Sequence, residues 1–151
     1  MDYPWYDIVN GGDIEQGEVI ENCPVLILPP DVTLYSPDAP EQAYEIPFET
    51  RDVIVLSQTC DMVMGQERTS EVLLCAVWRR SDLETAHPMH KLQSWEDARK
   101  GRRPAFHILN KCDIEGFERD FGLVDFRRVH SLPLDVVSPH ISQGWWILRG
   151  G

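Results

Sequence analysis

The chain has 151 residues, a length that fits one domain and lets about two thirds of the unfolded surface be buried without disulfides or metal. Its 42% hydrophobic and 26% charged residues are typical of a globular protein and exclude a disordered or fibrous chain. The formal net charge of -11, from 14 Lys and Arg against 25 Asp and Glu, disfavours nonspecific binding to RNA or DNA.

The start of the chain and its cysteines indicate the compartment. Residues 1–5 carry no positive leader, and no stretch approaches the roughly 20 apolar residues of a membrane span. The four cysteines are widely scattered, which favours reduced thiols over a disulfide framework. We expect a cytoplasmic protein without membrane contact.

The first third of the chain predicts two short strands and a loop. Residues 12–20 and 24–28 read as strands joined by a turn. Residues 29–50 contain five prolines among acidic residues, and prolines cannot donate to a sheet ladder. The sequence therefore predicts a long, acidic, Pro-rich loop over 29–50.

The middle of the chain predicts the core of a sheet. Residues 53–56 are all apolar, as in a strand that is covered on both faces, and we expect this strand to be central. Residues 71–78 form a second buried strand that pairs with it as a hairpin.

One helix and further strands follow. Ser94 lies three residues before Asp97, which predicts a capped helix start within a short helix over 92–101, ended by Gly101. Residues 105–109, 122–129 and 145–148 read as strands. We expect residues 1–151 to form a single β domain.

The segment after the central strand, residues 57–61, is the main candidate site. As a nucleophile, Cys60 would need a nearby cation or histidine, and the neighbouring Asp61 acts against this. In a structural interpretation, Ser57, Thr59 and Asp61 bond the backbone of a tight turn and Cys60 is a small buried apolar side chain. In a third interpretation, Ser57, Gln58, Thr59 and Asp61 form a polar rim that recognises a ligand or partner.

Histidines and cysteines offer only a weak metal site. His87 and His90 are three residues apart, and Cys112 could complete a zinc site with them. Because the sequence has no CxxC pair and no HExxH motif, we expect no cofactor, with zinc as the alternative and solvated loop histidines as the simpler interpretation.

Later polar residues give further candidates. Because histidine is the side chain whose charge ordinarily changes near neutral pH, His107 and His130 are each candidates for a general base or a switch. Arg127 and Arg128 could grip a phosphate or carboxylate, although arginines beside an aspartate, here Asp125, usually form surface ion pairs.

Three motifs occur in order along the chain. They are Gly12-Asp13-Ile14, residues 52–61 ending in Ser-Gln-Thr-Cys-Asp, and residues 124–129, Val-Asp-Phe-Arg-Arg-Val. The chain resembles a family of uncharacterised bacterial proteins with a GDI…VLSQ(S/T)CD…VDFR signature. This resemblance implies membership of a family rather than a chemistry.

The layout is also similar, more distantly, to the MazF/PemK type of SH3-like barrel. That family opens with a Gly-Asp strand, and a loop arginine and a Ser or Thr take part in RNA cleavage. Arg51 lies near the place of that arginine, but Arg51-Asp52 replaces the expected Arg-Pro. We expect a mainly β fold: a small, partly open antiparallel barrel of about six strands, with one short helix and a long Pro-rich loop.

We expect the protein to be a non-catalytic binding or regulatory module that contacts a protein partner through the acidic loop and the Cys60 edge of the barrel. An acidic surface suits a basic partner, such as a nucleic-acid-binding protein. Two enzymes are the alternatives. The first is a toxin-like endoribonuclease that uses Arg51, Ser57, Thr59 and either His107 or Arg128. The second is a thiol hydrolase that uses Cys60 with His107 or His130.

Overall fold

The computed structural model describes residues 6–9, 13–28, 45–63, 65–116, 118–137 and 147–150. Most of the predicted acidic loop, up to residue 44, and residues 145 and 146 of the last predicted strand lie outside these ranges.

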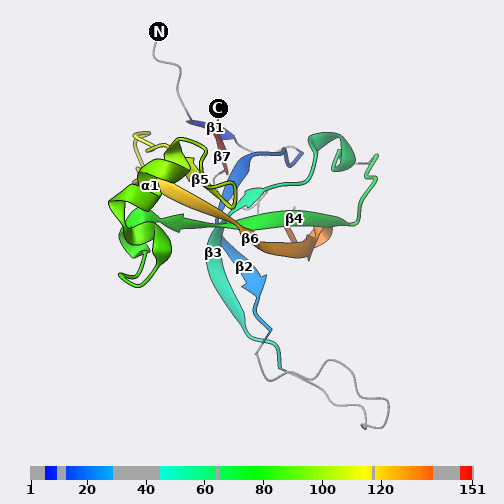
Figure 1. The fold of residues 1–151 in the computed structure, drawn as a ribbon. Coiled ribbons are helices and arrows are strands. Elements are labelled where there is room, and N and C mark those ends of the chain that lie inside the picture. The colour runs from blue at the N-terminus through cyan, green and yellow to red at the C-terminus, as the bar shows by residue number, and fades with distance from the viewer. Residues whose placement is uncertain are drawn as a thin grey trace, which may run out of the picture.

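Seven strands form one antiparallel sheet in the order β1-β7-β2-β3-β4-β6-β5 (Figure 1). The strands are β1 (Tyr6–Val9), β2 (Glu18–Leu26), β3 (Phe48–Val55), β4 (Glu71–Arg79), β5 (Phe106–Leu109), β6 (Gly122–Pro133) and β7 (Ile147–Gly150). The five strands β2 to β6 form its main part, and β7 and β1 extend it beyond β2. The described residues also include helix α1 (Leu92–Arg99) and the short 3-10 helices Thr59–Asp61, Arg80–Asp82 and Pro88–His90, and residues 134–137 are helical directly after β6.

The sheet is not closed into a barrel. A closed barrel requires every strand to pair on both sides, but in the described part of the chain β1 pairs only with β7 and β5 only with β6. The Tyr6 hydroxyl of β1 donates to the Asn110 carbonyl, just after β5, at 2.7 Å. The two edge regions are therefore joined by a side-chain hydrogen bond and not by strand pairing. The mainly β antiparallel fold with a short helix is confirmed, whereas the partly open barrel that the sequence predicted is not, because the sheet is not closed into a barrel.

β3 is the middle strand, and both of its faces are covered as predicted. Val53 and Val55 are buried in one apolar cluster with Leu74 of β4. Ile54 points to the opposite side, where it packs against Cys75 and other residues of a second cluster. β3 and β4 pair antiparallel, which confirms the predicted hairpin.

The predicted pair of strands in residues 12–28 is wrong, because β2 is a single bent strand. Its pairing with β3 shifts register between Ile20 and Cys23. Asn22 has a positive φ of 52°, which asparagine tolerates better than most residues, and its amide donates to Asp52 Oδ1 at 3.1 Å. The chain therefore bends here without leaving the sheet.

The predicted loop over 29–50 is also wrong at its end, since β3 begins at Phe48. Phe48 pairs with Leu26, so residues 48–50 belong to the sheet. Pro47 cannot donate to a ladder, but its carbonyl accepts the Ile27 amide at 3.0 Å and holds the entry to the strand. Figure 1 shows β2 and β3 leaving the rest of the sheet as a two-stranded arm.

The predicted helix over 92–101 is confirmed, but its start is not the one expected. Lys91 occupies the N-cap without a side-chain cap, and Ser94 lies inside the helix and is buried. Burial of Trp95 and Ala98 against β5 and β6 fixes the helix more strongly than a capping serine would. Among the described residues no helix is long and apolar enough to cross a membrane.

The pairing of β4 with β6 is irregular in its middle. Cys75 lies opposite Val129 and Val77 opposite Val124, so β6 advances five residues where β4 advances two. The three additional residues of β6 lie between Val124 and Val129, in the stretch that holds Asp125, Arg127 and Arg128. The chain thus leaves the regular ladder where the predicted arginines lie.

Candidate functional site

Residues 57–61, hereafter the corner, form a tight turn directly after β3. Residues Thr59–Asp61 form a 3-10 helix, in which the Asp61 amide donates to the Gln58 carbonyl at 3.0 Å. The Met62 amide donates to the Thr59 carbonyl at 3.0 Å in the same way. The sequence prediction of a polar corner at the end of a β-strand is therefore confirmed.

Two hydroxyls of the corner fasten it to neighbouring backbone. The Leu73 amide of β4 donates to Ser57 Oγ at 2.9 Å. The Gln16 amide, which precedes β2, donates to Thr59 Oγ1 at 3.0 Å. Each hydroxyl satisfies a backbone donor, as the structural interpretation expects, but the donors belong to β4 and to the segment before β2 and not to the turn itself.

Cys60 is exposed, so the expectation of a buried apolar side chain is wrong. The 3-10 turn places it beyond the sheet, where no core packs against it. Its sulfur lies 3.8 Å from Gln58 Oε1 and 3.9 Å from Asp61 Oδ1. Neither atom is a histidine nitrogen or a cation, the neighbours that activate a nucleophilic thiol.

A groove of about 490 Å³ lies beside the corner, hereafter the corner groove. It is lined by Leu56, Ser57, Gln58, Asp61, Thr69, Glu71, Leu73 and Ser131. Two of these residues, Asp61 and Glu71, are acidic, and none is basic. Leu73 is 46% exposed and gives the groove an apolar wall, and the Ser131 hydroxyl donates to the Glu71 carboxylate.

Sequence reasoning found the corner but missed the opposite wall of the groove. Glu71 and Leu73 lie on β4 and Ser131 on β6, and Leu73 pairs with Ser131 in the ladder. The sequence predicted both strands, but it did not predict that Leu73 and Ser131 lie opposite each other, because this depends on the register between β4 and β6. Residues 71–74 read Glu-Val-Leu-Leu, so no polar–apolar alternation in the sequence marked Leu73 as exposed.

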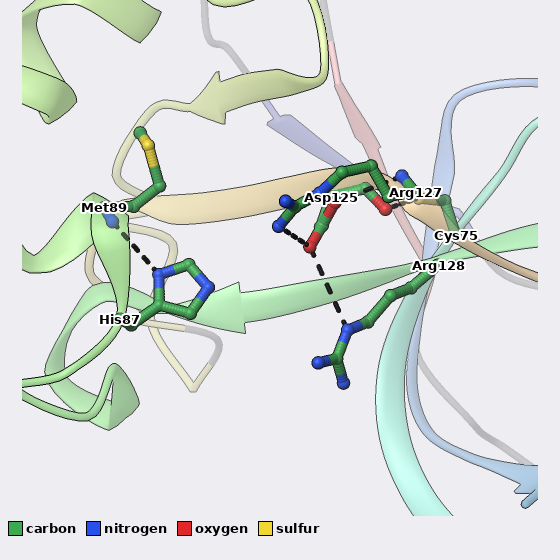
Figure 2. A network of polar contacts seen from close by, with 6 residues as sticks. All are labelled: Cys75, His87, Met89, Asp125, Arg127 and Arg128. Carbon is green, nitrogen blue, oxygen red and sulfur yellow. Dashed lines mark hydrogen bonds and ion pairs between the residues drawn. The ribbon is translucent and has the colours of Figure 1, made fainter.

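Arg127 and Arg128 converge on Asp125, as Figure 2 shows. Asp125 is only 1% exposed, and its carboxylate accepts from Arg127 Nε at 2.8 Å and Nη2 at 2.9 Å. Arg128 Nε lies 4.0 Å from the same carboxylate. Burial alone would raise the pKa of Asp125, but the hydrogen bonds from Arg127 and the charges of both arginines hold this pKa below its ordinary value.

A tryptophan that sequence reasoning missed lies between two of the candidate arginines. The guanidinium carbon of Arg51 lies 4.5 Å from the Trp78 ring centroid, and that of Arg128 lies 5.5 Å from it. Burial, followed by the charges of Arg51 and Arg128, lowers the pKa of His130. Arg51 lies just before the β3 residues that pair with β4, so a correct β3–β4 register would have revealed its contact with Trp78.

The residues expected in a ribonuclease site do not form one cluster. Arg51 and Arg128 meet at Trp78, but Ser57 lies six residues along the chain from Arg51, about 20 Å in an extended strand. His107 lies on β5, opposite Val124 at the other end of β6 from the corner. His107 and His130 are likewise not among the polar partners of Cys60 in the described part of the chain.

The metal candidates are also apart. His87 Nδ1 accepts the Met89 amide at 3.1 Å, and His90 Nδ1 lies 3.3 Å from the Leu83 carbonyl oxygen. Cys112 is buried in an apolar cluster with Tyr6. Over the described ranges, no group of three His, Cys, Asp or Glu side chains could hold a metal ion.

Comparison with known proteins adds no assignment, since no family model, curated protein or solved structure matches this chain.

Proposed function

We propose that this chain is a non-catalytic binding module and that the corner groove accepts a basic side chain of a protein partner. The observation that carries this proposal is the composition of the groove. Two carboxylates, Asp61 and Glu71, and the exposed Leu73 line it, and no basic residue does.

An arginine or lysine side chain suits this composition. Its aliphatic stem can cover Leu73 while its charged head bonds the carboxylates, because these side chains combine an apolar stem with a cationic tip. Charge-assisted hydrogen bonds of this kind are stronger than neutral ones. The net charge of -11 would also attract a basic partner from a distance.

The chemistry of the corner supports binding rather than catalysis. Ser57 and Thr59 already accept backbone amides, and the Cys60 sulfur lies beside acceptor oxygens. The acidic loop over 29–44, which lies outside the described residues, stays a predicted second contact with the partner.

An endoribonuclease is the second candidate, and one observation favours it. Arg51 and Arg128 both lie over Trp78, and arginines with an aromatic ring suit a nucleic acid strand. The distant sequence resemblance to SH3-like barrels of the MazF/PemK type, which cleave RNA, points to the same candidate. Incubation with total RNA tests it, since cleavage that Arg51→Ala abolishes would support the nuclease and contradict a purely binding role.

The binding proposal is tested with a pair of labelled peptides. One contains a single arginine among glycines and alanines, and the other has citrulline, the neutral isostere, in its place. Fluorescence anisotropy at low salt should show tighter binding of the arginine peptide. The double variant Asp61→Asn, Glu71→Gln should lower that affinity by about tenfold, because it removes both charges and keeps the shape of the groove.

Glu84→Gln is the matched control. Glu84 is an exposed acid beyond the far end of β4, and its substitution removes one negative charge outside the groove, where the double variant removes two within it. The control should bind both peptides as the wild type does. Equal affinity of the wild type for arginine and citrulline, or an equal loss in Glu84→Gln, would contradict the proposal.

A further inference from the structure

A second and larger cavity lies at the other end of the sheet, between α1 and β5. Its volume is about 640 Å³, within the range of about 300–1,000 Å³ typical of small-molecule sites. The apolar part of its lining comes from Tyr6, Trp95, Ile108, Leu109 and Phe121.

The aromatic walls of this cavity are held in place by their surroundings. Trp95 is 3% exposed and packs edge to face with Phe121, with ring centroids 6.4 Å apart. Tyr6 is 5% exposed and is fixed by the hydrogen bond of its hydroxyl to the Asn110 carbonyl. A ligand would therefore meet preformed apolar surfaces and would not need to order them.

The charged groups of the cavity differ in how they are paired. Arg99 donates to Glu96 through Nε at 3.2 Å and Nη2 at 2.9 Å, so these two charges offset each other. Arg80 lies over the Trp95 ring, with its guanidinium carbon 4.7 Å from the centroid. No carboxylate of the described residues forms an ion pair with Arg80.

We propose that this cavity binds a small organic anion that carries one carboxylate on a planar apolar ring. The ring suits the aromatic and aliphatic walls, and the carboxylate matches the two parallel donors of the Arg80 guanidinium. The single arginine without an ion pair favours a single negative charge. The negative net charge of the chain as a whole disfavours ligands with several negative charges.

This site is independent of the corner groove. The groove lies where Glu71 pairs with Pro133, whereas the cavity lies beyond the opposite end of this ladder, where Arg79 pairs with Gly122. Loss of the peptide-binding function would therefore leave the second site intact.

Titration of the full chain with four probes tests the proposal. Isothermal calorimetry measures the affinity for 2-naphthoate, for its neutral counterpart 2-naphthylmethanol, for acetate and for inorganic phosphate. We expect 2-naphthoate to bind at least about tenfold tighter than each of the others. Its addition should also shift the indole NH signal of Trp95 in the nitrogen-proton NMR spectrum, assigned with a Trp95→Phe variant.

Arg80→Gln should abolish the preference for 2-naphthoate over the neutral alcohol. The matched control is Arg102→Gln, which removes an exposed arginine outside the cavity and should keep the preference. Arg80→Lys keeps the charge but loses the two parallel donors, so it should lower the preference for 2-naphthoate in part. If Arg80→Gln does not fold, the Arg80→Lys variant is used in its place.

Three results would overturn the proposal. They are no binding of 2-naphthoate, equal binding of 2-naphthoate and one of the other probes, and a loss of affinity in Arg102→Gln equal to that in Arg80→Gln.

Discussion

The two ends of the β4–β6 pair differ in both charge and construction. At the Glu71 end, carboxylates and hydroxyls line the corner groove, and hydrogen bonds to backbone amides hold the turn. At the Arg79 end, arginines lie over aromatic rings: Arg80 over Trp95, Arg127 over Phe106, and Arg51 and Arg128 over Trp78. The net charge of -11 therefore agrees with the corner groove but does not describe the Arg79 end.

One sheet thus carries two surfaces of different composition. Apolar packing supports both ends: Trp95 and Leu123 pack at the end that bears α1, and Met62, Val72 and Leu132 pack in another cluster next to the corner. Cys60 of the corner is exposed and lies outside these clusters. Substitutions of buried residues should therefore affect stability strongly, whereas a substitution of Cys60 should not.

The largest effect is expected from Trp95→Ala. Trp95 is buried between α1, β5 and β6, so its removal should lower the free energy of unfolding by about 3–5 kcal/mol, measured by urea denaturation. Leu92→Ala on the same helix is the control, because Leu92 is 66% exposed and should cost at most about 0.5 kcal/mol. A loss under about 1 kcal/mol in Trp95→Ala would show that packing does not dominate this end.

Asp125→Asn should have an intermediate effect that depends on pH. The native pKa of Asp125 lies below its ordinary value, so its ionised form stabilises the fold above that ordinary value. This contribution is lost as the pH falls through the lower native pKa. At pH 7 the variant should be less stable by about 1–2 kcal/mol, a modest figure because Arg127 is more than half exposed.

The difference in free energy of unfolding between the wild type and Asp125→Asn should disappear as the pH falls below about 4, which acid denaturation curves measure. Asp113→Asn, at an exposed acid, should stay within about 0.5 kcal/mol of the wild type at pH 7. A gap for Asp125→Asn that widens in acid would contradict the stabilising role of the ionised carboxylate.

The smallest effect on stability is expected at the corner, from Cys60→Ser. Since Cys60 is exposed, the free energy of unfolding should change by less than about 0.5 kcal/mol. In the folded wild type, iodoacetamide should label Cys60 and leave Cys23, Cys75 and Cys112 unlabelled until urea is added. Burial raises the pKa of Cys23 to about 11 and, with the charge of Asp125, that of Cys75 to about 11, which adds to their protection.

Mass spectrometry of the alkylated protein counts the labelled thiols. An unlabelled Cys60 in the folded chain would contradict its exposure. Cys60→Ser should also bind the arginine peptide within about twofold of the wild type, and a larger loss would show that the sulfur takes part in recognition.

The sequence was sufficient for features that depend on local pattern. The apolar run 53–56 predicted a central strand, and the helix over 92–101 was found although Ser94 was misread as its cap. In that helix the capping signal competed with the packing of Trp95, and packing decided the boundary.

Other features depend on distant partners and could not be predicted in the same way. The bend of β2 at Asn22 is supported by Asp52, thirty residues along the chain. The exposure of Cys60 follows from where the chain turns after β3, since period-two alternation ends with the strand. The contact of Arg128 with Trp78 requires the irregular register of β6.

The irregular stretch of β6 also determines which side chains reach the core. Leu123 and Leu132 lie opposite Trp78 and Val72, two β4 residues of the same side, and both leucines are buried. In a regular strand, Leu123 and Leu132 would face opposite sides of the sheet, because one has an odd and the other an even position. The three additional residues in the middle of β6 shift this alternation, so both leucines face the same side. The irregular stretch thereby sets the phase of the strand and also presents the guanidinium groups of Arg127 and Arg128 to Asp125, so the position of both arginines depends on the correct register of the core strands.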